Sequence, residues 1–115
     1  MIVVDSSDPT PPFEQIRRQL VDDIRGGTVA AGSKLPSVRQ LAGDLAVAPG
    51  TVARAYGELE AEGLVETSKT GTRVLPNHSL PDEVRNAAGR FVRAIPAASL
   101  EDALRAVRAE WNFRS

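Results

Sequence analysis

The stretch from Ser33 to Thr67 reads SKLPSVRQLAGDLAVAPGTVARAYGELEAEGLVET and contains the signals for two helices joined by a short turn. Ser37 is a suitable N-cap for a helix. Apolar residues then recur at helical steps of three and four: Val38, Leu41, Ala42 and Leu45. After the short turn AVAPG, Pro49 fits the first position of a second helix, and Gly63 fits its C-cap. The inward stripe of this second helix is Val52, Ala55, Tyr56 and Leu59. Two helices joined by so short a turn predict a helix-turn-helix.

The flanking segments complete a winged helix-turn-helix domain, which we assign to residues 1–76. Pro11–Pro12 suit a first helical turn. The apolar residues that follow keep helical spacing: Phe13, Ile16, Leu20, Val21 and Ile24. Gly26–Gly27 end this helix, and TVAAGSKLP then forms a connector. After the helix-turn-helix, the extended runs Leu64–Thr67 and Thr72–Leu75 flank the hairpin turn SKTG.

Residues 77–115 form a second region of two amphipathic helices. We expect the first helix to end before Pro96, and Ser99 with Asp102 to cap the second. Helices this short make only a thin layer, so their apolar stripes need a partner surface. A symmetric homodimer is favoured over packing against the winged domain. The residues expected at the dimer contact are Val84, Ala88, Phe91, Val92, Ile95, Leu100, Leu104, Val107 and Trp111.

The composition excludes several classes of function. The chain has no cysteine and a single histidine, His78, which argues against a thiolate or transition-metal site. No grouping typical of a catalytic triad, a phosphate-binding loop or a dinucleotide site is present, so neither an enzyme nor a bound cofactor is expected. The N-terminus lacks the pattern of a signal peptide, and no apolar run is long enough for a membrane helix. We therefore expect a cytoplasmic protein.

The charge pattern is compatible with DNA binding although the formal net charge is −1. The acidic residues of the helix-turn-helix gather late in it, where Glu58 and Glu62 would form a solvated face away from phosphate. Arg54 lies near the start of the helix that begins at Pro49, and it could reach a guanine edge or a phosphate. Arg39 lies on the outer side of the helix that Ser37 caps. Each arginine has the competing interpretation of an ordinary solvated side chain, and so have Lys69 and Arg73 around the hairpin turn.

Four pieces of the chain, PFEQI, LPSVRQLA, TVARAYGELEAEGLV and GTRV, together resemble the winged-helix domain of the GntR family of bacterial transcription regulators. The YtrA-type subfamily is the most similar, and the resemblance spans about Pro11–Val74. It implies a dimeric, sequence-specific repressor in which two short C-terminal helices mediate dimerisation. It also implies DNA contacts by Arg39, by Ala48–Thr51 with Arg54, and by the wing tip Lys69–Gly71.

One departure from the family pattern concerns the start of the recognition helix. Relatives commonly have Asn-Pro-Asn-Thr where this chain has Ala48–Thr51. Both amide side chains are missing, so we expect Arg39 and Arg54 to carry more of the binding than usual. The complete set of expected DNA contacts is Ser37, Arg39, Pro49, Gly50, Thr51, Arg54, Lys69, Thr70, Gly71 and Arg73.

Two other functions remain open from the sequence. The chain could be a winged-helix scaffold that binds proteins and not DNA; scattered positions of the four cations Arg39, Arg54, Lys69 and Arg73 would favour that alternative. It could also sense a small molecule in a pocket formed by its C-terminal aromatic residues: Phe91, Trp111 and Phe113. The sequence identifies no effector.

Overall fold

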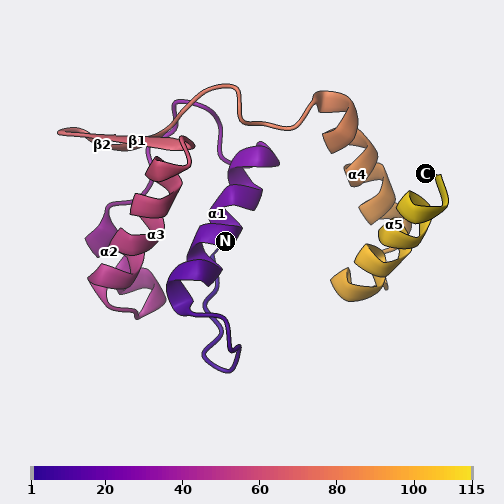
Figure 1. Cartoon of the computed structure of the whole chain (residues 1–115), viewed down its shortest axis with the longest axis horizontal. Helices are drawn as coiled ribbons and strands as arrows, with labels where there is room; N and C mark the ends of the chain where they lie inside the picture. The colour runs from indigo at the N-terminus through magenta and orange to yellow at the C-terminus, as the bar shows by residue number, and fades with distance from the viewer. Residues whose placement is uncertain (1, 115) are drawn as a thin grey trace. The chain divides into compact units, whose positions relative to one another are not determined.

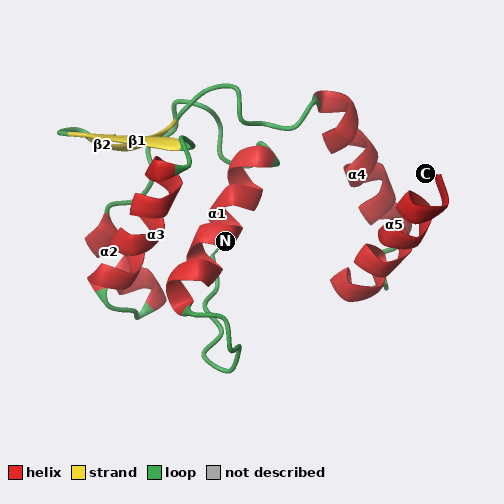
Figure 2. Ribbon diagram, viewed as in Figure 1, coloured by secondary structure: helices red, strands yellow, loops and turns green. Residues whose placement is uncertain are grey.

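The computed structural model describes residues 2–114. The chain divides into two compact units, one ending at Leu80 and the other beginning at Pro81. The first unit contains, in chain order, helices α1 (Pro12–Arg25), α2 (Val38–Leu45) and α3 (Pro49–Ala61) and strands β1 (Val65–Ser68) and β2 (Gly71–Val74). The second unit contains α4 (Asp82–Ala94) and α5 (Leu100–Arg114) (Figures 1 and 2). The predicted winged helix-turn-helix fold is thus confirmed, together with the two helices that follow it.

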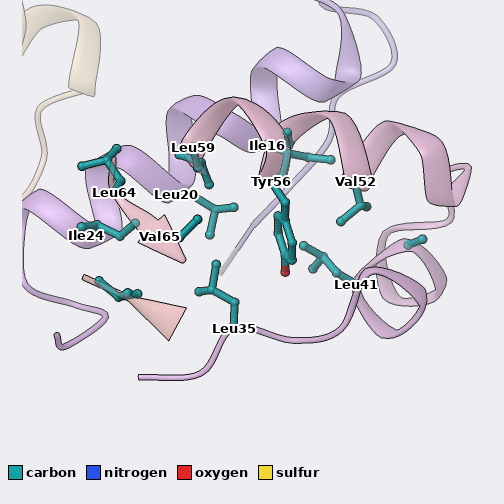
Figure 3. Packing of buried hydrophobic residues seen from close by; sticks show 13 residues of the cluster. Ile16, Leu20, Ile24, Leu35, Leu41, Val52, Tyr56, Leu59, Leu64 and Val65 are labelled. Carbon is teal, nitrogen blue, oxygen red and sulfur yellow. The ribbon is translucent and has the colours of Figure 1, made fainter. Parts of the chain in front are cut away.

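The core of the first unit is built around α3, which packs against α1, α2 and β1. Its buried face is the predicted stripe, since Val52, Ala55 and Leu59 are fully enclosed. Opposite this face lie apolar residues of α1, of α2, of the strands and of the segments just before α2 and β1 (Figure 3). They are Ile16, Leu20, Ile24, Leu35, Leu41, Ala42, Leu64, Val65 and Val74. Burial of these side chains contributes about 1.5–3 kcal/mol for each large residue, which fixes the position of α3.

The helix ends follow local capping chemistry. The Ser37 hydroxyl accepts a hydrogen bond from the backbone N–H of Gln40 at 3.1 Å, as expected of an N-cap. Ala46 closes α2 in the left-handed conformation, with φ of 55°, and turns the chain into α3. The sequence predicted Gly63 as the C-cap of α3, but the C-cap is Glu62. Gly63 is the next residue and takes the positive φ of 78° that ends the helix.

The wing is an antiparallel hairpin with a two-residue turn. Val65 pairs with Val74 at one end of the hairpin and Ser68 with Gly71 at the other. β1 begins and ends one residue later than the predicted run, and β2 begins and ends one residue earlier, because Ser68 and Gly71 pair with each other. The Leu75 N–H still donates to the Leu64 carbonyl at 3.0 Å.

A third stretch of extended chain lies beside β2, where the sequence predicted a plain connector. The Gly32 N–H donates to the Val74 carbonyl at 2.8 Å, and the Val74 N–H donates to the Ser33 carbonyl at 2.9 Å. The Leu35 N–H donates to the Thr72 carbonyl at 2.8 Å. Residues 32–35 therefore widen the wing beyond its two named strands.

Two glutamines of α1 hold the N-terminal arm. Gln19 accepts a hydrogen bond from the Val3 N–H at 2.9 Å and donates to the Val3 carbonyl at 2.7 Å. Gln15 makes the same pair of bonds with Asp5, at 2.8 and 3.0 Å. The extended start expected from the sequence is thus fixed along α1 by side-chain amides that replace a neighbouring strand.

The second unit differs from the first because no residue of α4 or α5 is buried. Side chains that are apolar and large nevertheless line both helices, and Leu104, Val107 and Trp111 are 45%, 44% and 58% exposed. No helix within residues 2–114 is both long enough and apolar enough to cross a membrane.

Candidate nucleic-acid interface

The first turn of α3 is open to a ligand. Pro49 occupies its start, and the N-cap Ala48 provides no side-chain hydrogen bond. Backbone N–H groups in such a turn point out of the helix and carry a partial positive charge. Pro49 has no N–H, and the Thr51 N–H already donates to the Ala48 carbonyl at 3.0 Å. The Gly50 N–H is therefore the group in this turn that can bind a phosphate, with the Thr51 hydroxyl on the same turn.

The outer face of α3 is nearly bare. Opposite the buried stripe lie Gly50, Ala53 and Gly57, which are all exposed. A methyl group added at Gly50 or Gly57 would meet no atom within 4 Å. The helix backbone can therefore approach another surface closely, and the long side chain beside Gly50 and Gly57 is that of Arg54.

Arg54 lies at the side of α3 that faces α1. Its guanidinium stacks over the ring of Phe13, with Cζ 3.7 Å from the ring centroid. The Arg54 Nε lies 3.9 Å from Glu58 Oε1, one helical turn along α3. The side chain is still 63% exposed, so this arginine is both oriented and accessible. The sequence marked Phe13 only as an apolar helix residue, because its contact with Arg54 depends on how α1 and α3 pack.

A cluster of charged side chains links α1 to the C-terminal part of α3. Arg17 of α1 donates to Glu14 at 2.6 Å and to Glu62, the C-cap of α3, at 2.8 Å. The Arg17 Nε also lies 3.8 Å from Glu58 Oε2. The hydrogen bond from Arg17, with a further bond from Arg18, lowers the pKa of Glu14 to about 2.

The acidic residues of α3 therefore have a structural use. The sequence predicted a solvated face at Glu58 and Glu62, whereas both contact Arg17 and hold α3 against α1. Within residues 2–114 no group of three potential ligands is placed to hold a metal ion.

Tyr56 connects α3 to the segment that leads into α2. Its hydroxyl donates to the Pro36 carbonyl at 2.7 Å. Burial raises the pKa of Tyr56 to about 12. This bond fixes the residues just before α2, and so sets the position of Arg39, which is exposed on that helix. The Ser37 hydroxyl oxygen accepts the capping bond from Gln40, and its O–H can still donate to a phosphate.

The expected wing contacts lie together on one hairpin. Lys69 and Thr70 form its turn, and Arg73 follows on β2; all three are exposed. Arg73 Nη1 donates to the Gly32 carbonyl at 3.2 Å. Among the residues expected to touch DNA, the structure thus groups four on the wing, four at the start of α3 and two around the start of α2.

In the second unit, α4 and α5 carry the residues expected at a dimer contact. Phe91 and Trp111 line a cavity of about 360 Å³ with Ala106, Val107, Glu110 and Arg114. The Arg114 guanidinium lies 4.0 Å from the Trp111 ring centroid. Phe113 was predicted as a further residue of an aromatic pocket, but its side chain is 90% exposed and it is not among these lining residues.

Comparison with known proteins identifies the family. Residues 12–83 match the bacterial regulatory proteins of the gntR family. The HTH-type transcriptional regulator Rv1152 of Mycobacterium tuberculosis is 41% identical over 105 residues, which cover 89% of this chain and 87% of that protein. The HTH-type transcriptional repressor YtrA of Bacillus subtilis is 44% identical over 78 residues, covering 67% of this chain and 60% of that protein.

Solved structures agree with this assignment. YtrA from Sulfolobus acidocaldarius, a GntR-family transcription factor, superposes with a TM-score of 0.64 at 32% identity, covering 84% of this chain and 98% of that one. The DNA-binding domain of AraR in complex with operator ORR3 gives a TM-score of 0.51 at 25% identity, covering 54% of this chain and 76% of that one.

The family match covers more than half of the chain, and it includes all of the helix-turn-helix and the wing. The resemblance to YtrA-type regulators is confirmed by both the sequence relative and the solved structure. The chain belongs to the GntR family of bacterial regulatory proteins and is a transcription regulator with a winged helix-turn-helix DNA-binding domain, not an enzyme.

Proposed function

We propose that this regulator works as a homodimer that represses transcription by binding a palindromic operator. The observation that carries the proposal is the pairing, in one chain, of a helix-turn-helix with an open α3 start and two helices whose apolar stripes are exposed. The first provides a surface for DNA, and the second provides a surface for another copy.

On the DNA side, α3 enters the major groove with its first turn leading. Gly50 and Ala53 let the backbone approach, Thr51 contacts a phosphate or a thymine methyl, and Arg54 reaches a guanine or a phosphate. Arg39 contacts the DNA from α2, and Lys69 with Arg73 contacts it from the wing. The operator complex of the AraR domain supports this arrangement, because that domain shares the fold.

On the dimer side, α4 and α5 of one copy cover those of a second copy. Each large apolar side chain that becomes fully buried contributes about 1.5–3 kcal/mol, so the two stripes together can hold a stable pair. A two-fold dimer presents two copies of α3 about 34–36 Å apart, which is one turn of DNA. The operator is therefore expected to be palindromic.

Repression is the proposed sign of regulation because the Bacillus subtilis relative is a transcriptional repressor by name. A protein of this size represses most simply by occupying a promoter. Transcription in vitro from a promoter that contains the selected operator tests the sign: adding the protein should lower transcript yield, and a rise would contradict repression.

The decisive experiment is selection of bound duplexes from a random library, followed by footprinting on the DNA around the protein's own gene. We expect an enriched motif with two-fold symmetry, and sedimentation should show two chains on each operator. An unordered pool of sequences would contradict specific binding. A single half-site bound by one chain would contradict the dimer alone.

A further inference from the structure

The extended stretch of residues 32–35 places Lys34 directly opposite Arg73 of β2. The two residues form an antiparallel bridge, and the backbone hydrogen bonds of Ser33 and Leu35 with β2 lie on either side of it. Lys34 and Arg73 are therefore a non-hydrogen-bonded pair, in which the two side chains lie closer together than in a hydrogen-bonded antiparallel pair. Two cations therefore face each other across adjacent strands.

Both side chains lie on the outer face of the wing. Successive residues of a strand point to opposite faces, and the neighbours Leu35, Thr72 and Val74 are buried. Lys34 and Arg73 are exposed. The cation pair is consequently available to a ligand approaching the wing from outside.

The Lys34 side chain extends along this face to the wing turn. A methyl group added at Gly71 would lie 2.5 Å from Lys34 Cε and 3.4 Å from its Nζ. Gly71 also has a φ of +123°, which other residues rarely adopt. The absence of a side chain at Gly71 thus gives the Lys34 ammonium a place beside the turn that carries Lys69.

Within residues 2–114, neither Lys34 nor Arg73 forms an ion pair with a carboxylate. Glu66 stands opposite Arg73 on β1, but the Arg73 guanidinium turns the other way and donates to the Gly32 carbonyl. Like charges directly opposite each other in a sheet are destabilising, so an anion bound between them would relieve their repulsion.

We propose that Lys34 and Arg73 together bind a backbone phosphate of DNA. This inference rests on the proposed DNA binding and extends the wing contact from the hairpin tip to a third strand. The ligand is a phosphodiester rather than a base edge, because the Lys34 ammonium acts as a point charge and the Arg73 guanidinium already donates to the Gly32 carbonyl. Lys34 should therefore contribute to affinity for every sequence and leave sequence preference unchanged.

The salt dependence of binding tests this role. Fluorescence anisotropy with the full chain and a short duplex of unrelated sequence gives the slope of log K against log salt concentration. Lys34→Gln should reduce the magnitude of this slope by about 0.9 for each bound chain. Lys34→Arg should preserve the slope, because it keeps the charge. Arg25→Gln, at an exposed position in the last turn of α1, is the matched control and should also leave the slope unchanged.

Failure of the inference is distinct from failure of the proposed function. If the wild-type chain binds DNA and Lys34→Gln has the wild-type slope, the Lys34 contact is wrong while DNA binding stands. If the wild-type chain binds no DNA, both are wrong. The thermal midpoint of the DNA-free protein gives a second test: Lys34→Gln should raise it by relieving the repulsion, and a decrease would overturn the argument for an unneutralised pair.

Discussion

At the scale of single residues, Arg54 is the exposed cation whose position is fixed most clearly. Phe13 and Glu58 orient its guanidinium, while more than half of the side chain remains accessible. Because the remaining outer face of α3 is bare, we expect Arg54→Ala to weaken operator binding by about 1–3 kcal/mol. Anisotropy titration with the selected operator measures this loss, and sedimentation should show that the dimer is intact. Unchanged affinity would remove Arg54 from the interface.

Phe13 allows the origin of this effect to be tested. Phe13→Leu keeps an apolar side chain but removes the aromatic face under Arg54, so we expect about 0.5–1 kcal/mol of lost operator affinity. In the Arg54→Ala background the same change should cost nothing, because there is no guanidinium left to orient. Equal losses in both backgrounds would mean that Phe13 acts by some route other than Arg54.

Tyr56 carries a prediction about stability rather than binding. Removing its hydroxyl leaves the Pro36 carbonyl without this partner, so Tyr56→Phe should lower the free energy of unfolding by about 0.5–1.5 kcal/mol at neutral pH. The raised pKa of Tyr56 means that the folded state keeps this proton while the unfolded state loses it. Its contribution is therefore present below pH 10 and is lost as the pH rises towards 12.

Urea unfolding at neutral pH and at alkaline pH compares the two proteins. The wild-type chain should lose more stability between pH 10 and 12 than Tyr56→Phe does, because only the wild type carries this titrating group. Parallel decreases in the two proteins would show that Tyr56 does not contribute to the alkaline loss.

At the scale of elements, the charge pairs within α1 are expected to make stability depend on pH, because Arg17 and Arg18 both bond to Glu14. The lowered pKa of Glu14 means that the unfolded chain takes up this proton at higher pH than the folded chain. The stabilisation is therefore complete above pH 4.5 and is lost as the pH falls towards 2. We expect thermal unfolding of Glu14→Gln to show a smaller acid loss than the wild type across this window.

Glu66→Gln is a suitable control for that experiment, since Glu66 is exposed on β1 and forms no ion pair among residues 2–114. Its acid-induced loss of stability should follow the wild type. If Glu14→Gln also follows the wild type from pH 4.5 to 2, the contacts of Glu14 with Arg17 and Arg18 within α1 do not stabilise the folded chain.

The sequence predicted these elements because their signals are local. Periodic apolar residues, the Ser37 cap and the glycine after α3 each act within a few positions of the chain. The pairing of residues 32–35 with β2 has no such signal, since it joins segments about forty positions apart through a single bridge. The stacking of Arg54 on Phe13 and the ion pair between Arg17 and Glu62 likewise exist only once α1 and α3 have packed.

At the scale of the whole molecule, the two units differ in how completely they bury their apolar side chains. The first unit has a closed core and needs no partner to bury its apolar residues. No residue of α4 or α5 is buried, so the apolar stripes of these helices remain in water unless another surface covers them. DNA binding by a single unit of this kind would read only one half-site, and the covering of α4 and α5 by a second copy would double the number of contacts.

Leu104 is the residue at which the proposed contact between two copies of the chain can be tested. Leu104→Asp places a charge in the exposed apolar stripe of α5, so burial against a second copy would desolvate it. We expect the dimer to dissociate about a hundredfold more readily or worse, which corresponds to roughly 3 kcal/mol. Sedimentation should show monomers, and binding to the palindromic operator should fall with the loss of the second half-site. The thermal unfolding of the first unit should be unchanged, because Leu104 lies outside its core.

Ala109→Asp is the matched control, because it introduces the same charge at an exposed position on the opposite side of α5. That variant should remain dimeric and bind the operator as the wild type does. Dissociation of both variants would mean that charge anywhere on α5 disrupts assembly, and the stripe would lose its special role. A Leu104→Asp protein that stays dimeric would show that α5 does not form the contact between copies, while leaving the DNA-binding unit intact.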